Sequence, residues 1–174
     1  MPSQLYFFVS VALSFIAWGI VARGYIWPRV RHLPRMDALR PILVLHTFRF
    51  MGLAFLVPGV VSPDLPSAFA NPVAYGDFIA AILALLSLAL LKRGGVGLGI
   101  AWIFNVWGAA DLLNAFYQGN NVTLVPGQLG ATYIIPTFVV PLLLITHGLA
   151  FRILLMPQAS VRETSGPQVI APAR

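Results

Sequence analysis

The sequence contains no cysteine and very little charge. The absence of cysteine excludes disulfide bonds, thiolate metal ligands and a cysteine nucleophile. Charged residues make up only 9% of the 174 residues, whereas hydrophobic residues make up 59%. A soluble domain carries about 25% charged residues, so this chain has too few charges to cover a water-exposed surface. Despite a net charge of +6, the composition excludes a soluble nucleic-acid-binding domain and predicts an integral membrane protein.

Five apolar stretches reach the length of about 20 residues that a helix needs to cross the hydrocarbon core. Short segments rich in proline, glycine and asparagine separate them. The first stretch is long and has no basic region before it, so we expect it to be retained rather than cleaved as a signal peptide. The sequence therefore predicts an all-α bundle of five transmembrane helices in one domain of residues 1–156. The expected spans are residues 5–25, 41–61, 72–91, 96–117 and 131–155.

The distribution of basic residues predicts how this bundle is oriented. Ten of the eleven Lys and Arg residues lie near the first or third connecting loop or towards the C-terminus, and the loops at 62–71 and 118–130 contain none. The positive-inside rule then places the N-terminus outside and residues 157–174 in the cytoplasm as a mobile polar tail. We expect a bacterial cytoplasmic membrane. The first loop also predicts contact with anionic lipid head groups through Arg29, Arg31 and Arg35.

A few polar side chains lie inside the predicted spans. A charged group near the centre of a span costs roughly 2.5–3.5 kcal/mol on insertion, so such residues are candidates for a functional site. The rise of the helix places the two histidines at matching depths in the cytoplasmic half and the carboxylates in the outer half. We expect six side chains to form a buried polar cavity or ion-pair network: His46, Arg49, Asp77, Asp111, Asn114 and His147.

Arg49 is expected to pair with a carboxylate, because an unpaired charge in lipid is costly. Asp111 is the favoured partner and Asp77 is the alternative. Trp107, Asp111 and Asn114 are spaced i, i+4 and i+7, so they share one face of the fourth span. The simplest packing turns this face towards the interior of the bundle.

Three functions are compatible with these features. The first is a non-catalytic membrane protein that binds or moves a small solute or a proton, as a homo-oligomer or as an accessory subunit of a larger complex. The second is a redox protein that binds haem b or a quinone, with His46 and His147 as axial haem ligands. The third is an intramembrane lipid-modifying enzyme. The sequence contains no HExxH or GxSxG motif, so it assigns no catalytic residue and predicts no metal site.

Overall fold

The computed structural model describes residues 2–157, which form helices joined by short loops and contain no strand. Residues 158–174 of the predicted tail lie outside the described residues. Five helical segments are long and apolar enough to cross a membrane, as the sequence predicts. They are Ser3–Val30, Arg35–Leu56, Ser67–Arg93, Gly95–Asn121 and Ile135–Leu155.

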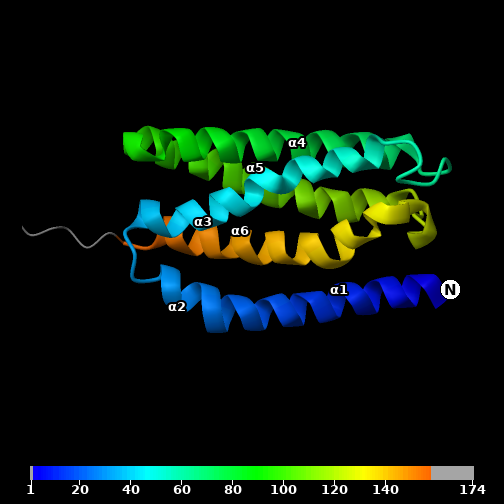
Figure 1. Cartoon of the computed structure of the whole chain (residues 1–174), viewed down its shortest axis with the longest axis horizontal. Helices are drawn as coiled ribbons and strands as arrows, with labels where there is room; N and C mark the ends of the chain where they lie inside the picture. Colours follow the sequence, from blue (N-terminus) through cyan, green and yellow to red (C-terminus); the bar gives the residue numbers. More distant parts are fainter. Residues whose placement is uncertain (1, 158–174) are drawn as a thin grey trace, which may run out of the picture.

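Figure 1 labels the α-helices of these segments. Most of the segments combine an α-helix with a stretch of another helix type. The first contains α1 (Pro2–Val21), the π-helical turn η1 (Ala22–Ile26) and α2 (Trp27–Val30). The second contains α3 (Arg35–Thr47) and the 3₁₀ helix η2 (Phe48–Leu56). The remaining elements are α4 (Ser67–Leu90), η3 (Leu91–Arg93), α5 (Gly95–Asn121), η4 (Pro126–Tyr133), η5 (Ile135–Val139) and α6 (Val140–Leu155).

Two helices begin earlier than predicted, because an upstream proline sets each start. Pro34 and Pro66 adopt extended ψ angles of 144° and 124° and immediately precede α3 and α4. Pro41 and Pro72, which were the predicted first residues, lie inside these helices. A proline in a helix removes one backbone hydrogen bond, and these helices tolerate that loss near their N-terminal ends.

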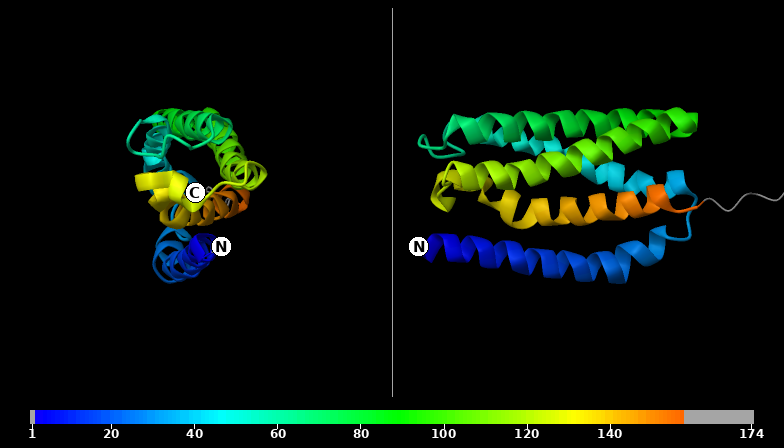
Figure 2. Two further views of the ribbon diagram at one scale, coloured as in Figure 1. Left: turned by 90° about the vertical axis from the view of Figure 1, so that its right-hand side faces the viewer. Right: turned by 180° about the vertical axis from the view of Figure 1, so that it is seen from behind.

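Four of the spans surround a common interior, and the first lies outside them (Figure 2). Helix α3 with η2 packs on α4, α4 packs on α5, α5 packs on α6, and α6 packs back on α3. Helix α1 runs along α6 and η5. Only 6% of the most apolar part of the first span is buried, against 33–44% in the other four. The first span is therefore a peripheral helix with a large apolar surface.

Specific contacts hold α1 and α2 against the last span. The Trp18 indole Nε1 donates a hydrogen bond of 3.1 Å to the Phe138 carbonyl oxygen, and the two rings lie edge to face with centroids 5.2 Å apart. Towards the C-terminal end of the first span, in α2, the Arg152 guanidinium lies 4.0 Å from the centre of the Trp27 ring. Such contacts between a cation and an aromatic face are attractive, so the first span is fastened to the last span at Trp18 in α1 and at Trp27 in α2.

The 3₁₀ geometry of η2 determines which of its side chains face the interior. A 3₁₀ helix has three residues per turn, so residues three apart lie on one line. Arg49, Gly52 and Phe55 follow this spacing and are the buried residues of η2, and His46 lies three residues before them at the end of α3. An α-helical spacing would have rotated this line away from the interior after about two turns.

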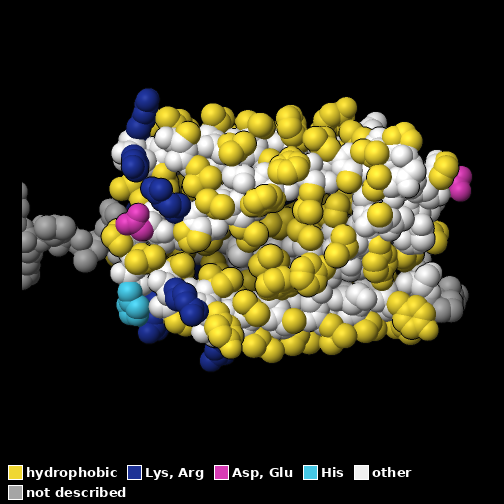
Figure 3. Space-filling view, in the orientation of Figure 1, with side chains coloured by type: hydrophobic (Ala, Val, Ile, Leu, Met, Phe, Trp, Pro, Cys, Tyr) yellow, Lys and Arg dark blue, Asp and Glu magenta, His cyan; other side chains and the backbone are white. Residues whose placement is uncertain are grey.

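The charged side chains concentrate at one end of the molecule, which we call the basic end. Lys and Arg residues gather there, and a broad hydrophobic belt covers the length of the bundle (Figure 3). Inside, one apolar cluster fills the basic half and includes Leu39, Phe104 and Ile153. A second cluster fills the opposite half and includes Phe69 and Leu129. The buried ionisable side chains His46, Arg49, Asp77 and His147 lie between these clusters.

The two loops at the opposite end are joined to each other. The Ser62 amide donates to the Gln128 carbonyl at 3.0 Å, and the Ala131 amide donates to the Val60 carbonyl at 2.9 Å. Between them, Gly130 has a φ of 54° and lies so close to the Val60 carbonyl that a side chain would collide with it. Glycine is the residue that adopts this conformation without strain, so it allows the two loops to meet.

Candidate functional site

Arg49 is the centre of a buried ion-pair network. From η2, its Nε donates to Asp77 Oδ1 on α4 at 2.7 Å, and its Nη2 donates to Asp111 Oδ2 on α5 at 2.6 Å. Its Nη1 donates to the Gly108 carbonyl at 3.0 Å. The sequence predicted one carboxylate partner, whereas the structure gives Arg49 both. Three helices are thereby joined through one guanidinium, which is fully buried.

A pair of histidines extends this network towards the basic end. His147 Nε2 lies 3.3 Å from Arg49 Nη1, which is a donor, so Nε2 accepts and Nδ1 carries the proton. That proton is directed to Asn105 Oδ1, 2.7 Å away. The His46 ring lies against the His147 ring with centroids 4.2 Å apart, and its Nε2 is 3.0 Å from Thr146 Oγ1. Both imidazoles are buried.

This arrangement does not fit a haem between the two histidines. A bis-histidine haem requires the macrocycle to pass between its axial ligands, but these two imidazole rings are in direct contact. Phe104 also packs against both of them, with ring centroids 5.1 and 5.2 Å away. His46 and His147 therefore form a packed aromatic and polar cluster in place of an open axial-ligand pair.

Three glycines make room for the network. A Cβ atom on Gly108 would lie 2.6 Å from His147 Cε1 and 2.7 Å from Arg49 Nη1. A Cβ on Gly76 would collide with the Asp111 carboxylate, and one on Gly52 would collide with the Asp77 carboxylate. Each ionic group thus occupies the volume that a side chain on the neighbouring helix would take.

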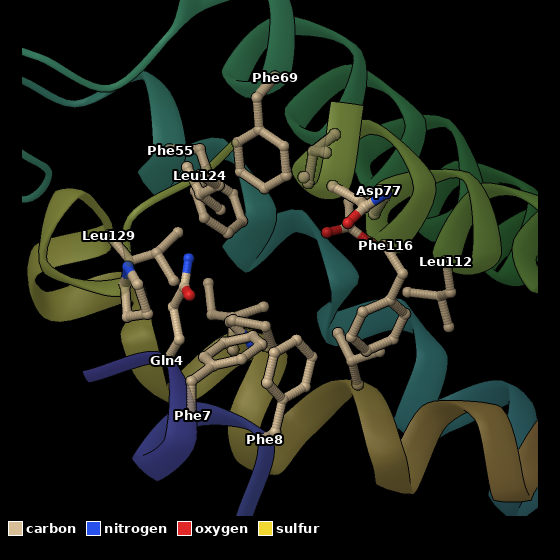
Figure 4. Close-up of a pocket in the computed structure, with 18 of the residues that line it drawn as sticks. Gln4, Phe7, Phe8, Phe55, Phe69, Asp77, Leu112, Phe116, Leu124 and Leu129 are labelled. Atoms are coloured by element: carbon tan, nitrogen blue, oxygen red, sulfur yellow. The ribbon is translucent and has the colours of Figure 1, made fainter. Parts of the chain in front are cut away.

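A cavity of about 280 Å³ opens beside the two carboxylates, in the half of the bundle away from the basic end. This volume is at the lower end of the range of about 300–1,000 Å³ that is typical of small-molecule sites. Asp77 and Asp111 line it, and their side chains are 6% and 11% exposed. Figure 4 shows Asp77 at the edge of the space that the aromatic residues surround. These are Phe7, Phe8, Phe55, Phe69 and Phe116.

Residues 6–155 match the family model described as a domain of unknown function (DUF8737). The chain belongs to this family. The match includes the ion-pair network, both histidines and nearly all of the residues that line the cavity. No curated protein and no solved structure matches the chain. The family description names no activity, so the geometry of the site is what indicates a function.

Asn114 is the one predicted site residue that the structure leaves outside the network. It is exposed on α5, and Trp107 on the same predicted face is 43% exposed. The buried face of α5 is formed by Ala101, Phe104 and Gly108 and their helical neighbours. At about 100° per residue, Asn114 points roughly 130° away from the centre of this face. Asp111 lies at its edge, where it reaches Arg49.

The sequence interpretation also missed the role of the glycines. Nothing in the sequence interpretation identified Gly52, Gly76 and Gly108 as the positions that an ionic group or a histidine of a neighbouring helix approaches. A local signal was present, because Gly76 directly precedes Asp77 and Gly108 lies three residues before Asp111. A glycine inside an apolar span beside a charged residue indicates close approach of another helix.

At the basic end, the three arginines predicted to contact lipid make contacts within the protein. Arg29 Nη1 donates to the Tyr25 carbonyl at 2.7 Å, and Arg31 Nε donates to His32 Nε2 at 2.8 Å. Arg35 donates to the Met156 carbonyl at the end of α6. Arg29 and Arg31 are exposed. The binding of anionic head groups stays a prediction for these residues.

Proposed function

We propose that this protein is a multi-pass membrane protein that binds a small, largely apolar solute in the cavity beside Arg49, Asp77 and Asp111. Five apolar helices and a hydrophobic belt support the membrane setting. The concentration of Lys and Arg at the basic end supports an orientation with that end in the cytoplasm and the N-terminus outside. In this orientation the cavity lies in the outer half of the bundle.

The orientation has a direct test, because the chain contains no cysteine. Single cysteines introduced as Asp64→Cys and Lys92→Cys replace exposed residues at opposite ends of the molecule, in a loop and in η3 respectively. In intact cells, an impermeant maleimide is expected to label Asp64→Cys and to label Lys92→Cys only after lysis. The reverse pattern would contradict the proposed orientation.

The binding proposal is supported chiefly by one feature of the cavity. Its floor is polar, and beyond this floor the basic half of the bundle is closed by apolar side chains. The carboxylates of Asp77 and Asp111, which are both paired with Arg49, form the floor of the cavity. Beyond the histidines, the apolar cluster of the basic half contains Leu39, Leu43 and Phe104, which are each at most 1% exposed. A closed apolar half next to an open cavity is typical of a binding site that is accessible from one side of a membrane.

A neutral aromatic probe tests whether the cavity binds a solute. We expect 2-(4-fluorophenyl)ethanol to bind the protein in lipid nanodiscs, measured by the ¹⁹F signal of the probe. Ala115→Trp is expected to abolish binding because Ala115 lines the cavity. Ala110→Trp is the matched control, since Ala110 is exposed on the same helix. Binding that Ala110→Trp and Ala115→Trp affect equally would reflect partition into lipid and would refute the proposal for this probe.

We further propose that binding precedes one of two events: movement of the solute across the membrane, or its transfer to a partner subunit. Movement would require the apolar cluster of the basic half to open, and we expect a homo-oligomer in that case. Uptake of the solute into proteoliposomes that contain only this protein would distinguish the first event from the second.

A further inference from the structure

We propose that the occupant of the cavity is a small organic monocation: an ammonium group on an apolar, preferably aromatic, body. The inference rests on the proposed function, since it specifies which solute the cavity binds. Two independent features of the cavity support it, namely the balance of charge at its floor and the chemistry of its walls.

The floor of the cavity holds more negative than positive charge. One guanidinium, from Arg49, faces two carboxylates, from Asp77 and Asp111. The neighbouring His147 accepts a hydrogen bond at Nε2 and is therefore neutral. His46 contacts no carboxylate, so a charge on it would be buried without a partner. The ionised network thus has a net charge of −1, and burial of unbalanced charge is costly.

The cavity is where an additional cation would restore the balance. Asp111 is the more accessible of the two carboxylates, with its side chain 11% exposed, and it lines the cavity. Its Oδ2 bonds to Arg49, while its Oδ1 lies against Gly76 and makes no hydrogen bond among the described residues. An ammonium group in the cavity would find this carboxylate on the floor and would replace water as its hydrogen-bond donor.

The walls of the cavity favour the same class of ligand. Five phenylalanines line it, and no Lys, Arg or His among the described residues does so. Phe55 and Phe69 lie edge to face with centroids 5.8 Å apart, and Phe7 and Phe8 lie edge to face at 5.6 Å. Aromatic faces attract cations, and aromatic rings around a carboxylate form a typical recognition site for ammonium groups. An anionic solute would meet two carboxylates and no basic side chain among the described residues that line the cavity.

Three probes that share one aromatic ring test the inference on the unaltered protein. They are 2-(4-fluorophenyl)ethylammonium, 2-(4-fluorophenyl)ethanol and 3-(4-fluorophenyl)propanoate, each titrated into nanodiscs of neutral lipid at pH 7. We expect the ammonium probe to bind at least tenfold more tightly than the alcohol, and the carboxylate probe not to bind. An alcohol that binds as tightly as the ammonium would overturn the inference and leave the proposed solute binding intact. If no probe binds in an Ala115→Trp-sensitive manner, both proposals fail.

Two carboxylate variants then test whether Asp111 causes the preference for the ammonium probe over the alcohol. Asp111→Asn is expected to reduce the preference for the ammonium over the alcohol to threefold or less. Asp64→Asn is the matched control, because Asp64 is exposed in a loop at the same end of the molecule and does not line the cavity. Equal selectivity in the two variants would show that a general surface potential attracts the cation, and it would overturn the assignment to the cavity.

Discussion

Replacement of Gly108 by alanine is expected to destabilise the protein, although alanine is the better helix former. In an unhindered helix, alanine stabilises by about 0.5–1 kcal/mol relative to glycine. At position 108, however, the new Cβ would lie 2.6 Å from His147 Cε1 and 2.7 Å from Arg49 Nη1. Neither group is free to move away, because Arg49 is bonded to two carboxylates and His147 to Asn105.

The size of the expected loss of stability in Gly108→Ala follows from the contacts that the new methyl group disturbs. Overpacking costs about 1–3 kcal/mol, and loss of the 3.0 Å hydrogen bond from Arg49 to the Gly108 carbonyl costs a further 1.5–3 kcal/mol or so. After subtraction of the gain in helix propensity, we expect a net loss of about 2–5 kcal/mol in the free energy of unfolding.

Unfolding of the purified protein in mixed micelles with an increasing fraction of SDS, followed by tryptophan fluorescence, measures this difference. Gly99→Ala is the matched control on the same helix, because a Cβ there would meet nothing within 4 Å. We expect Gly99→Ala to be at least as stable as the unaltered protein. Equal stability of Gly108→Ala and Gly99→Ala would refute the close approach of Arg49 and His147 to α5.

Three further predictions test other parts of the structure. Arg49→Leu is expected to lower the free energy of unfolding by about 3–5 kcal/mol, because it leaves buried carboxylates unpaired. Adding Asp111→Leu should restore at least about 1 kcal/mol of this loss. If the loss in the double variant equals the sum of the losses in the two single variants, the pairing is contradicted. Arg152→Gln should lower the free energy of unfolding by about 0.5–1 kcal/mol, because it removes the contact between the guanidinium and the Trp27 ring. Arg23→Gln, at an exposed position, should leave the free energy of unfolding unchanged. Addition of haemin to the purified protein should not produce the shifted, sharpened Soret band of a bis-histidine complex, because the two buried imidazoles are already in contact.

The number of spans, and most residues of the ion-pair network and the adjoining histidine pair, could be predicted from the sequence. Apolar length identifies a helix that crosses a membrane, and a charge within such a helix stands out because it is costly there. For this reason Arg49, Asp77 and Asp111 were recognisable as candidates without knowledge of the packing. The same argument identified His46 and His147 at matching depths.

The rotation of each helix could not be predicted, because the lipid-facing and protein-facing sides are both apolar. On α5, Trp107 and Asn114 were expected to face inward with Asp111, but the buried face is centred on Phe104 and Gly108. The change from α to 3₁₀ geometry after Thr47 also leaves no clear signal in hydropathy. That change keeps Gly52 and Phe55 on the same buried line as Arg49, so the close approach of Gly52 to Asp77 depended on a feature that sequence periodicity did not reveal.

The peripheral position of α1 has a consequence for how the chain is made. Trp18 and its partner Phe138 are 120 residues apart in the sequence. At a synthesis rate of about 5–20 residues per second, the first helix waits roughly 6–24 s after its own synthesis before the segment that receives it exists. During that interval α1 lacks its partner, and its almost unbroken apolar surface would suit a lipid environment. Because Phe7 and Phe8 of α1 form part of the cavity wall, the span that is synthesised before the other four completes the cavity last.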